Sequence, residues 1–579
     1  MVESLSLAAV RNDAAERSRG SPFIRRDLIY GLALLFIWLA VSLPRLEGPI
    51  DLRWDASTYY ILGTALAEGK GYRLLNEPGN IEAVQYPPLL PLMVALQQRL
   101  MGTSDYFTVG RALRLTYFLL SGIYLLVVYA LARQMLSPLH AFFVGAITGL
   151  SFNSFVYPSE TLYADLPFAF VSILFLVCHR KRNSPADTVA AGGLACASYL
   201  LRTAGIVLLA AWVIESLMRC RWKEAMIRAA VVAIPVLAWQ CYILHVTRSQ
   251  EYHQPFYSYQ RASYNYPNVT YAENSSLKHP FQPELGHSKT SDIFNRIIRN
   301  AVAIPVGLGE SSWFGRPFLQ YPLSKLSHIP PRGSQRIISR FLGISLVAVG
   351  LAALAGAVLM AMRGEWFLSL YFGLTLGVVV LTPWQSQFWR YLSPIAPLTL
   401  IFLIVTLLIA GNALARSFAM QSTVTNTLIT IVFTVMLLVQ AGIAVVFLRN
   451  LLPVSYYDAF GRERALHLLT YGAPDDSLDS AFEWIRRHAT ASAVIATAVP
   501  HRAYLRTGHK AVLPPFEPDP DRAIRLLDQV PVSYLVVDEL KRPPISDRYA
   551  TPLVQRAPRD WKLVYTSPGE GTQVYERIH

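Results

Sequence analysis

The tract Asp51-Leu52-Arg53-Trp54-Asp55-Ala56-Ser57-Thr58-Tyr59-Tyr60 follows an apolar stretch, Leu28–Leu43, that we expect to be the first membrane span. An ionisable side chain beside a bilayer is costly unless something uses it. Asp55 is therefore the first candidate functional residue, as a general base that takes a proton from a hydroxyl group. It can also start a helix over Ala56–Glu68, because Asp caps helices well. The two roles are compatible, since a helix start fixes the position of the carboxylate.

The composition is that of a membrane protein. Of 579 residues, 53% are hydrophobic and 16% are charged, whereas soluble domains carry about 25% charged residues. The formal net charge of +14 does not indicate a nucleic-acid partner, because many basic residues cluster in short gaps between apolar stretches. That distribution is typical of cytoplasmic loops.

We therefore expect a mainly α, polytopic membrane protein with about eleven transmembrane helices. The expected spans are residues 28–44, 112–132, 139–157, 161–178, 187–201, 204–218, 225–246, 338–361, 366–382, 391–411 and 425–448. Alternation of the basic gaps, such as His179–Arg182, favours a cytoplasmic N-terminal tail (1–27) and a C-terminus on the outer face.

This topology divides the chain into a transmembrane domain (28–449) with long outer loops at 45–111 and 247–337, and an outer-face region (450–579). In that last region, strand-like runs at Ala493–Thr497, Val532–Val537 and Trp561–Tyr565 alternate with helical stretches at Leu478–His488 and Asp521–Leu527. The alternation predicts a small α/β domain on the outer face.

Two further acids lie near the expected outer interface. Glu160 follows Pro158, which ends a helix, and we expect it to open the next one, either as a helix-start residue or as a second catalytic carboxylate. Asp165 lies in an otherwise apolar helix, where an ionisable group is a functional candidate by default.

Arg202 and Arg390 are cations on the expected outer side, against the positive-inside trend. A guanidinium group matches phosphate oxygens in bidentate fashion, although an interfacial arginine can also simply snorkel. The outer segments also carry polar and aromatic candidates for substrate binding, which are Asp165, Tyr59, Tyr86, Trp313 and Gln385. Interfacial aromatic residues are common, so contact with the bilayer is the alternative for the aromatic members.

Taken in order, these pieces resemble the GT-C class of integral-membrane glycosyltransferases, specifically the protein O-mannosyltransferase and lipid A aminoarabinose transferase family. The resemblance covers most of residues 28–410. It rests on Asp55 with Tyr59-Tyr60, Tyr86-Pro87-Pro88-Leu89-Leu90-Pro91, Glu160, Leu200-Leu201-Arg202 and Arg390-Tyr391-Leu392-Ser393-Pro394. The C-terminal region, with Phe482-Glu483-Trp484-Ile485, is similar to the outer domain of bacterial relatives.

The resemblance implies a polyprenyl-phosphate-linked sugar as donor and a lipid, glycan or protein hydroxyl as acceptor, at the outer face of a bacterial inner or plasma membrane. Asp55 would be the base of an inverting transfer, and Arg390 with Arg202 would bind the donor phosphate. The family often has a second acid directly after the first; here that position is Ala56, which leaves a divalent metal open and makes Glu160 the alternative second carboxylate. A transporter or flippase of lipid-linked sugars and a non-catalytic envelope scaffold are the competing functions.

Overall fold

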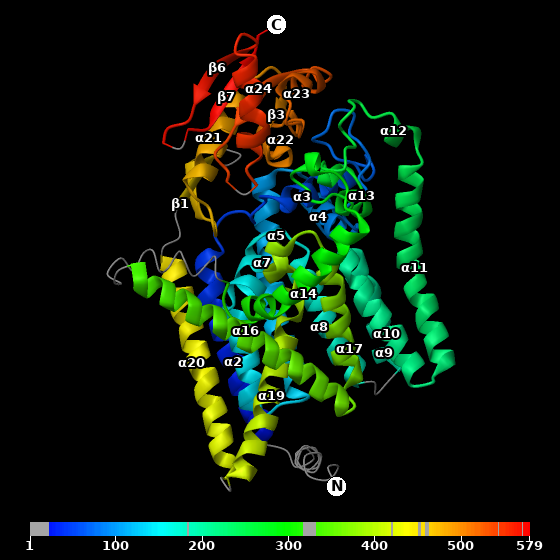
Figure 1. The fold of residues 1–579 in the computed structure, drawn as a ribbon, viewed down its shortest axis with the longest axis vertical. Coiled ribbons are helices and arrows are strands. Elements are labelled where there is room, and N and C mark those ends of the chain that lie inside the picture. The colour runs from blue at the N-terminus through cyan, green and yellow to red at the C-terminus, as the bar shows by residue number, and fades with distance from the viewer. Residues whose placement is uncertain are drawn as a thin grey trace.

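The structure, a computed structural model, describes residues 22–181, 185–315, 332–418, 421–449, 453–457, 463–541, 543–569 and 571–578. Residues 1–21 of the predicted N-terminal tail and 316–331 of the second predicted outer loop lie outside this range. The described helices and the C-terminal sheet stack along the long axis of the molecule, and the short helices α3, α4 and α13 lie at the junction between them (Figure 1).

The chain is mostly helical, as predicted. The helices are α2 (Pro22–Ser42), α3 (Asp55–Ala67), α4 (Leu89–Met101), α5 (Tyr106–Arg133), α6 (Pro138–Leu150), α7 (Tyr157–Glu160), α8 (Asp165–Lys181), α9 (Pro185–Leu201), α10 (Ile206–Met218), α11 (Trp222–Thr247), α12 (Gln250–His253), α13 (Tyr271–Ser275), α14 (Thr290–Ser312), α16 (Arg332–Met362), α17 (Trp366–Leu381), α18 (Phe388–Tyr391), α19 (Ala396–Ser417) and α20 (Ser422–Arg449).

Helices occupy all eleven predicted span ranges, but the count of eleven spans is not confirmed. Among the described residues, six helices are long and apolar enough to cross a membrane, or up to seven if one bent pair is a single span. Several of the others are short: α10 has 13 residues and α17 has 16. At 1.5 Å per residue, a helix of this length covers about 20–24 Å, less than the hydrocarbon core of about 30 Å.

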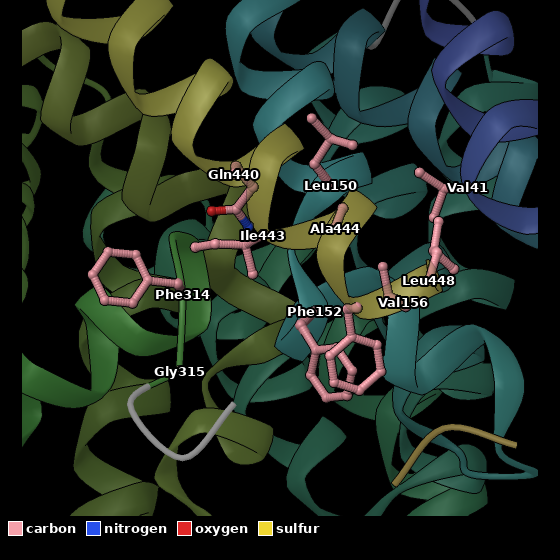
Figure 2. A pocket seen from close by; sticks show the side chains of 11 residues that line it. Val41, Leu150, Phe152, Val156, Phe314, Gly315, Gln440, Ile443, Ala444 and Leu448 are labelled. Carbon is pink, nitrogen blue, oxygen red and sulfur yellow. The ribbon is translucent and has the colours of Figure 1, made fainter. Parts of the chain in front are cut away.

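The bent pair is α6 and the helical segment Phe152–Glu160, which meet at an angle of 69°. The break falls at Ser151, whose backbone is extended and whose hydroxyl accepts from the backbone N–H of Ser154. Leu150 and Phe152, on the two sides of the break, line a small apolar hollow together with Gln440 of α20 (Figure 2). The predicted span 139–157 is therefore broken near its end, and the break redirects the chain into the turn that carries Glu160.

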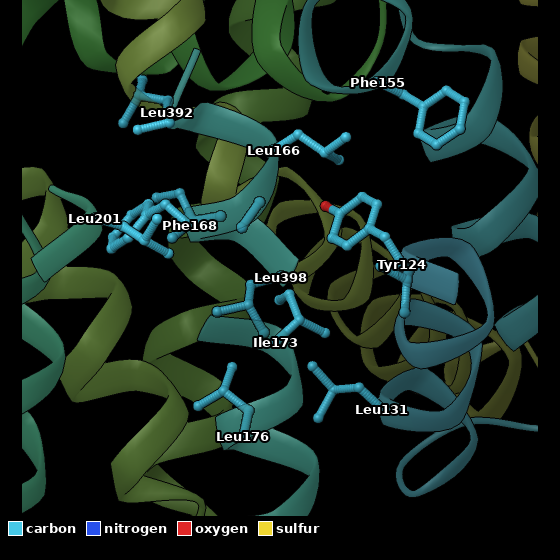
Figure 3. Close-up of a cluster of buried hydrophobic side chains, with 14 of the residues drawn as sticks. Tyr124, Leu131, Phe155, Leu166, Phe168, Ile173, Leu176, Leu201, Leu392 and Leu398 are labelled. Carbon is cyan, nitrogen blue, oxygen red and sulfur yellow. The ribbon is translucent and has the colours of Figure 1, made fainter. Parts of the chain in front are cut away.

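The apolar core joins α5, α8 and α19. Its members include Tyr124 and Leu131 of α5, Ile173 and Leu176 of α8, and Leu398 of α19, all fully buried or nearly so (Figure 3). This core holds α5 and α8 together, and Asp165 is the first residue of α8.

Two glycines allow α16 to approach its neighbours closely. A Cβ on Gly350 would overlap the carbonyl oxygen of Pro305 in α14, and a Cβ on Gly356 would overlap that of Phe402 in α19. Small residues at such contacts are typical of packed membrane helices.

The C-terminal region contains the predicted small α/β unit. Its strands are β1 (Pro453–Tyr457), β2 (Glu463–His467), β3 (Val494–Ala496), β4 (Lys510–Val512), β5 (Val532–Val537), β6 (Trp561–Thr566) and β7 (Gln573–Arg577), and its helices are α21 (Ala473–His488), α22 (Pro500–Thr507), α23 (Pro520–Leu527) and α24 (Thr551–Arg556). Strands β1 and β2 form an antiparallel pair. The five-stranded sheet has the order β4-β3-β5-β7-β6, with β4, β3 and β5 parallel and β7 and β6 antiparallel. The three strands expected from sequence, at 493–497, 532–537 and 561–565, are confirmed.

Candidate active site

A cavity of about 390 Å³ is lined by residues of several helices and of the loops that connect them. Asp55 lines it from α3, Arg202 from the connection between α9 and α10, and Arg390 from α18. Two of the predicted substrate-binding residues, Tyr59 and Tyr86, also line it. The structure thus brings together charged residues that are far apart in the sequence.

Asp55 is the first residue of α3, so the prediction of a helix start holds with a shift of one position. Trp54, rather than Asp55, occupies the cap position, and it makes no side-chain cap hydrogen bond. Its φ of 58° is in the left-handed region, which residues other than glycine rarely adopt. The Asp55 side chain is 25% exposed and is therefore accessible from the cavity.

Asp165 links the two arginines. Its carboxylate is 1% exposed, accepts from Arg390 Nε at 3.1 Å and forms an ion pair with Arg202. Arg390 also donates through Nη1 to Asp55 Oδ2 at 3.0 Å. The result is a continuous chain of ion pairs, Arg202–Asp165–Arg390–Asp55. Asp165 begins α8 rather than lying inside an apolar helix, because the chain before it is extended.

The guanidinium group of Arg390 is further held by an aromatic ring. Its central carbon lies 3.9 Å from the ring centroid of Tyr163, within the range of a strong cation–π contact. The Arg202 guanidinium lies 5.8 Å from the ring centroid of Tyr391. Aromatic stacking and a shared carboxylate therefore orient both cations before any ligand binds.

An aromatic wall faces these charges. The ring centroids of Tyr59 and Tyr86 are 4.6 Å apart, and Tyr86 lies 6.0 Å from Tyr266. Burial raises the pKa of the Tyr59 and Tyr86 hydroxyls well above the usual value, so both remain protonated donors. The Tyr86 hydroxyl is buried without a hydrogen-bond partner in the described structure, and it can bind a polar substrate group.

Glu160 lies outside this cavity. It ends α7 instead of opening the next helix, its carboxylate is 2% exposed, and Arg45 pairs with it at 3.0 Å. Its other oxygen accepts from the backbone N–H of Leu469 at 2.9 Å. The structure therefore joins Glu160 to the segment that leads into the C-terminal region, and it does not bring Glu160 to Asp55.

Trp313 and Gln385 are also not among the residues that line the cavity. Trp313 follows α14, where its carbonyl accepts from the Gln440 side chain at 2.5 Å. Gln385 lies in the turn before α18.

Comparisons of the chain with known proteins identify its fold. No protein-family model and no curated protein sequence matches the chain. Solved structures do match. One is the oligosaccharyltransferase AglB from Archaeoglobus fulgidus in complex with an inhibitory peptide and a dolichol-phosphate, with a TM-score of 0.53, 14% identity, and coverage of 96% of this chain and 75% of that chain.

The chain has a GT-C glycosyltransferase fold. The resemblance drawn from sequence is thereby confirmed at the level of fold. A second structure of the same protein, tethered to an acceptor peptide, matches with a TM-score of 0.51, 11% identity, and coverage of 96% and 74%. ArnT from Cupriavidus metallidurans bound to undecaprenyl phosphate matches with a TM-score of 0.49, 12% identity, and coverage of 95% and 98%.

Within the GT-C fold of this chain, the described residues offer a divalent metal few acidic ligands. Among the described residues that line the cavity, Asp55 is the one carboxylate, and Ala56 follows it. Asp165, behind it, is bound by two arginines, so a cation between the carboxylates would meet Arg390. No cluster of three His, Cys, Asp or Glu side chains suited to a metal occurs in the described residues.

Some residues that line the cavity are not among the predicted site residues. Tyr266 and Tyr271 belong to a tyrosine-rich loop, and Trp384 precedes α18. The feature of the sequence that pointed to Tyr266 and Tyr271 was the high number of tyrosines in that loop. It did not distinguish the residues that line the cavity from those, such as Tyr257, that are buried against Glu77.

Proposed function

We propose that the chain is a glycosyltransferase that moves a sugar from a polyprenyl-phosphate-linked donor to an acceptor hydroxyl. The observation that carries the proposal is the placement of one accessible carboxylate, Asp55, and two oriented arginines, Arg202 and Arg390, on the same cavity of a GT-C fold. A base and a phosphate-binding pair are the two elements that such a transfer needs.

The donor phosphate would bind between the arginines. A guanidinium group has five N–H donors, and Asp55 and Asp165 each take one from Arg390. Its other donors, together with the one that Asp55 would release and those of Arg202, suit the oxygens of a phosphodiester. Because both side chains are already oriented, little ordering is needed when the donor arrives.

The lining of the cavity also suits a lipid chain. Ile206 and Val207 of α10 and Val378, Val379 and Leu381 of α17 give one flank an apolar surface. A polyprenyl chain would extend along this flank, with its phosphate at the arginines and its sugar toward the aromatic wall. Aromatic rings and a buried, unpartnered Tyr86 hydroxyl are suited to binding a sugar.

In the transfer step, Asp55 would accept the proton of the acceptor hydroxyl. The acceptor oxygen forms a bond to the anomeric carbon as the bond from that carbon to the phosphate oxygen breaks, and polyprenyl phosphate leaves with the electron pair. Attack from the side opposite the phosphate inverts the anomeric carbon. Arg390 and Arg202 would stabilise the negative charge that grows on the leaving phosphate.

The ion pair between Asp55 and Arg390 gives the two substrates an order. A donor phosphate competes with Asp55 for Arg390, so donor binding frees the carboxylate to act as a base. We expect the donor to bind first.

On this proposal the cavity opens at the outer face of a bacterial inner or plasma membrane, and the acceptor is a lipid, a glycan or a protein. The comparisons do not favour a transporter or a scaffold.

Mass spectrometry of envelope lipids, glycans and proteins tests the proposal. Cells that lack the chain are compared with cells that carry the wild type or Asp55→Asn. We expect one sugar-modified species to be lost without the chain, restored by the wild type and not by Asp55→Asn. Restoration by Asp55→Asn would refute the role of the base, and no difference in any fraction would refute the transfer.

A further inference from the structure

The segment that leads to Asp55 is held on one side by the turn that carries Glu160. The backbone N–H of Asp51 donates to the Glu160 carbonyl at 3.0 Å, and the Asp51 carbonyl accepts from the Leu162 N–H at 3.0 Å. These bonds fix the segment four residues before Asp55, as a short parallel bridge between Asp51 and Thr161.

On the other side, Arg53 joins the same segment to the C-terminal region. Its side chain is 7% exposed, and it donates to Asp51 at 2.7 Å and to Asp475 of α21 at 3.1 Å. It also donates to the carbonyl oxygens of Leu469 at 2.6 Å and Thr470 at 3.3 Å. A single buried guanidinium group thus binds four acceptors from two distant parts of the chain, two residues before Asp55.

Leu469 completes the connection. Its N–H donates to the Glu160 carboxylate, and its carbonyl accepts from Arg53, so one peptide segment is held by both sides of the junction. This contact gives the buried Glu160 a use that does not require it to reach the cavity.

Asp475 carries the connection onward into the C-terminal region. Its second oxygen accepts from Arg502 of α22 at 2.7 Å. Helix α22 in turn packs on α3, the helix that begins at Asp55. The C-terminal region therefore contacts both the segment before Asp55 and the helix after it.

The backbone at Trp54 needs such support. Its left-handed conformation is costly for a residue with a Cβ, and it persists only where the surroundings hold it. The residue lies between Arg53, which is fixed by four acceptors, and Asp55, which is held by Arg390. Release of Arg53 would let the backbone at Trp54 relax, and the Asp55 carboxylate would move with it.

We propose that Arg53 is a positioning residue that makes the placement of Asp55 depend on docking of the C-terminal region through Asp475. This inference rests on the proposed function for the role of Asp55 in transfer, but the mechanical connection is independent of it. The C-terminal region then acts as a part of the active site, although in the described structure the cavity lining comes from the helical part.

Hydrogen exchange measured by mass spectrometry on the full-length protein tests the connection. In Asp475→Asn, which keeps the side-chain volume, we expect amides of residues 51–57 to exchange at least about threefold faster than in the wild type. Arg556→Ala is the matched control, because it removes an exposed ion pair with Asp521 inside the C-terminal region and leaves Arg53 untouched. Unchanged exchange at 51–57 in Asp475→Asn would overturn the proposal, as would an equal increase in α5 and α19.

Measurements of transfer and of lipid binding distinguish a role of Arg53 in positioning Asp55 from a general loss of structure. In Arg53→Lys and Asp475→Asn we expect transfer to fall about tenfold, while the Kd for undecaprenyl phosphate changes less than about threefold, because the phosphate-binding arginines are untouched. A parallel loss of lipid binding and transfer would contradict a positioning role. If the wild type transfers no sugar but exchange at 51–57 rises in Asp475→Asn, the connection stands and the proposed function is what has failed.

Discussion

Asp55 and Arg390, 335 residues apart in the sequence, are joined by an ion pair of 3.0 Å at the edge of the cavity. Asp55, the proposed base, is thereby bound to Arg390, the cation that we propose binds the donor phosphate. The ion pair explains how a carboxylate and a phosphate can share one small site, because each takes the place of the other on Arg390 during the cycle.

Asp55→Asn should abolish transfer without loss of donor binding. An amide cannot take the proton, so we expect at least a hundredfold drop in kcat, within the range of about 10²–10⁴ for general bases. Binding of undecaprenyl phosphate should be equal or tighter, since Arg390 loses a competing anion. Titration of the purified variant with the lipid, next to a transfer assay, measures both effects.

Asp105→Asn is the matched control, because Asp105 caps α5 and lies outside the cavity lining. Weaker lipid binding in Asp55→Asn would contradict the competition between Asp55 and the phosphate.

Arg390→Lys should weaken donor binding although the substitution keeps the positive charge. Lysine has no planar group to stack on Tyr163, and its single ammonium group cannot hold Asp165 and at the same time present a planar pair of N–H donors to the phosphate. We expect the donor KM to rise about tenfold or more, in line with about 1.5–3 kcal/mol for a hydrogen bond to a charged group. Arg416→Lys, an exposed change at the far end of α19, should leave the KM unaltered. Equal KM values in the two variants would exclude Arg390 from the phosphate site.

Asp165→Asn should affect stability as well as activity. Its carboxylate is 1% exposed and neutralises two arginines, so its loss leaves buried charge without compensation. Breaking a buried ion pair costs about 3–5 kcal/mol. We expect a clearly lower unfolding temperature than for Asp55→Asn, whose side chain is 25% exposed. Thermal unfolding of both variants in the same detergent makes the comparison; a stable Asp165→Asn protein would contradict the bridging role.

Much of this site could be predicted from sequence, and the reason is physical. Asp55, Asp165, Arg202 and Arg390 are charged residues at the ends of apolar stretches, where a charge is costly and therefore informative. The fold followed from the same pattern, together with the alternating runs of the C-terminal region.

The rest depended on tertiary structure. Glu160 gives the same signal as Asp165, but it is bound by Arg45 and Leu469, which come from distant parts of the chain, and it does not line the cavity. The count of eleven spans is not confirmed, because hydropathy does not show where a helix breaks, as at Ser151, or that α10 and α17 are short. Trp384 was missed because aromatic residues near a membrane surface are common.

Glu160→Gln should separate a structural role from a catalytic one. The change removes the charge that pairs with Arg45 and weakens the contact with Leu469. We expect a loss of stability of about 3–5 kcal/mol from the broken buried pair, with a donor KM that stays within about twofold. Glu68→Gln, which removes an exposed pair with Lys70, should be nearly neutral. A hundredfold fall in kcat for Glu160→Gln at unchanged stability would instead favour its sequence-based assignment as a catalytic acid.

The C-terminal region should become less stable as the pH falls below about 6.5, because of His501. Burial lowers the pKa of this side chain on α22 to about 3, whereas an unfolded histidine titrates near 6.5. Between these values the unfolded chain binds the proton and the folded chain does not, so stability falls as the pH is lowered through that window. At pH 5 the expected loss is about 2 kcal/mol relative to pH 7.5. Thermal unfolding between pH 7.5 and 5 should therefore show a steeper decline for the wild type than for His501→Gln, and parallel curves would show that His501 is protonated in the folded protein.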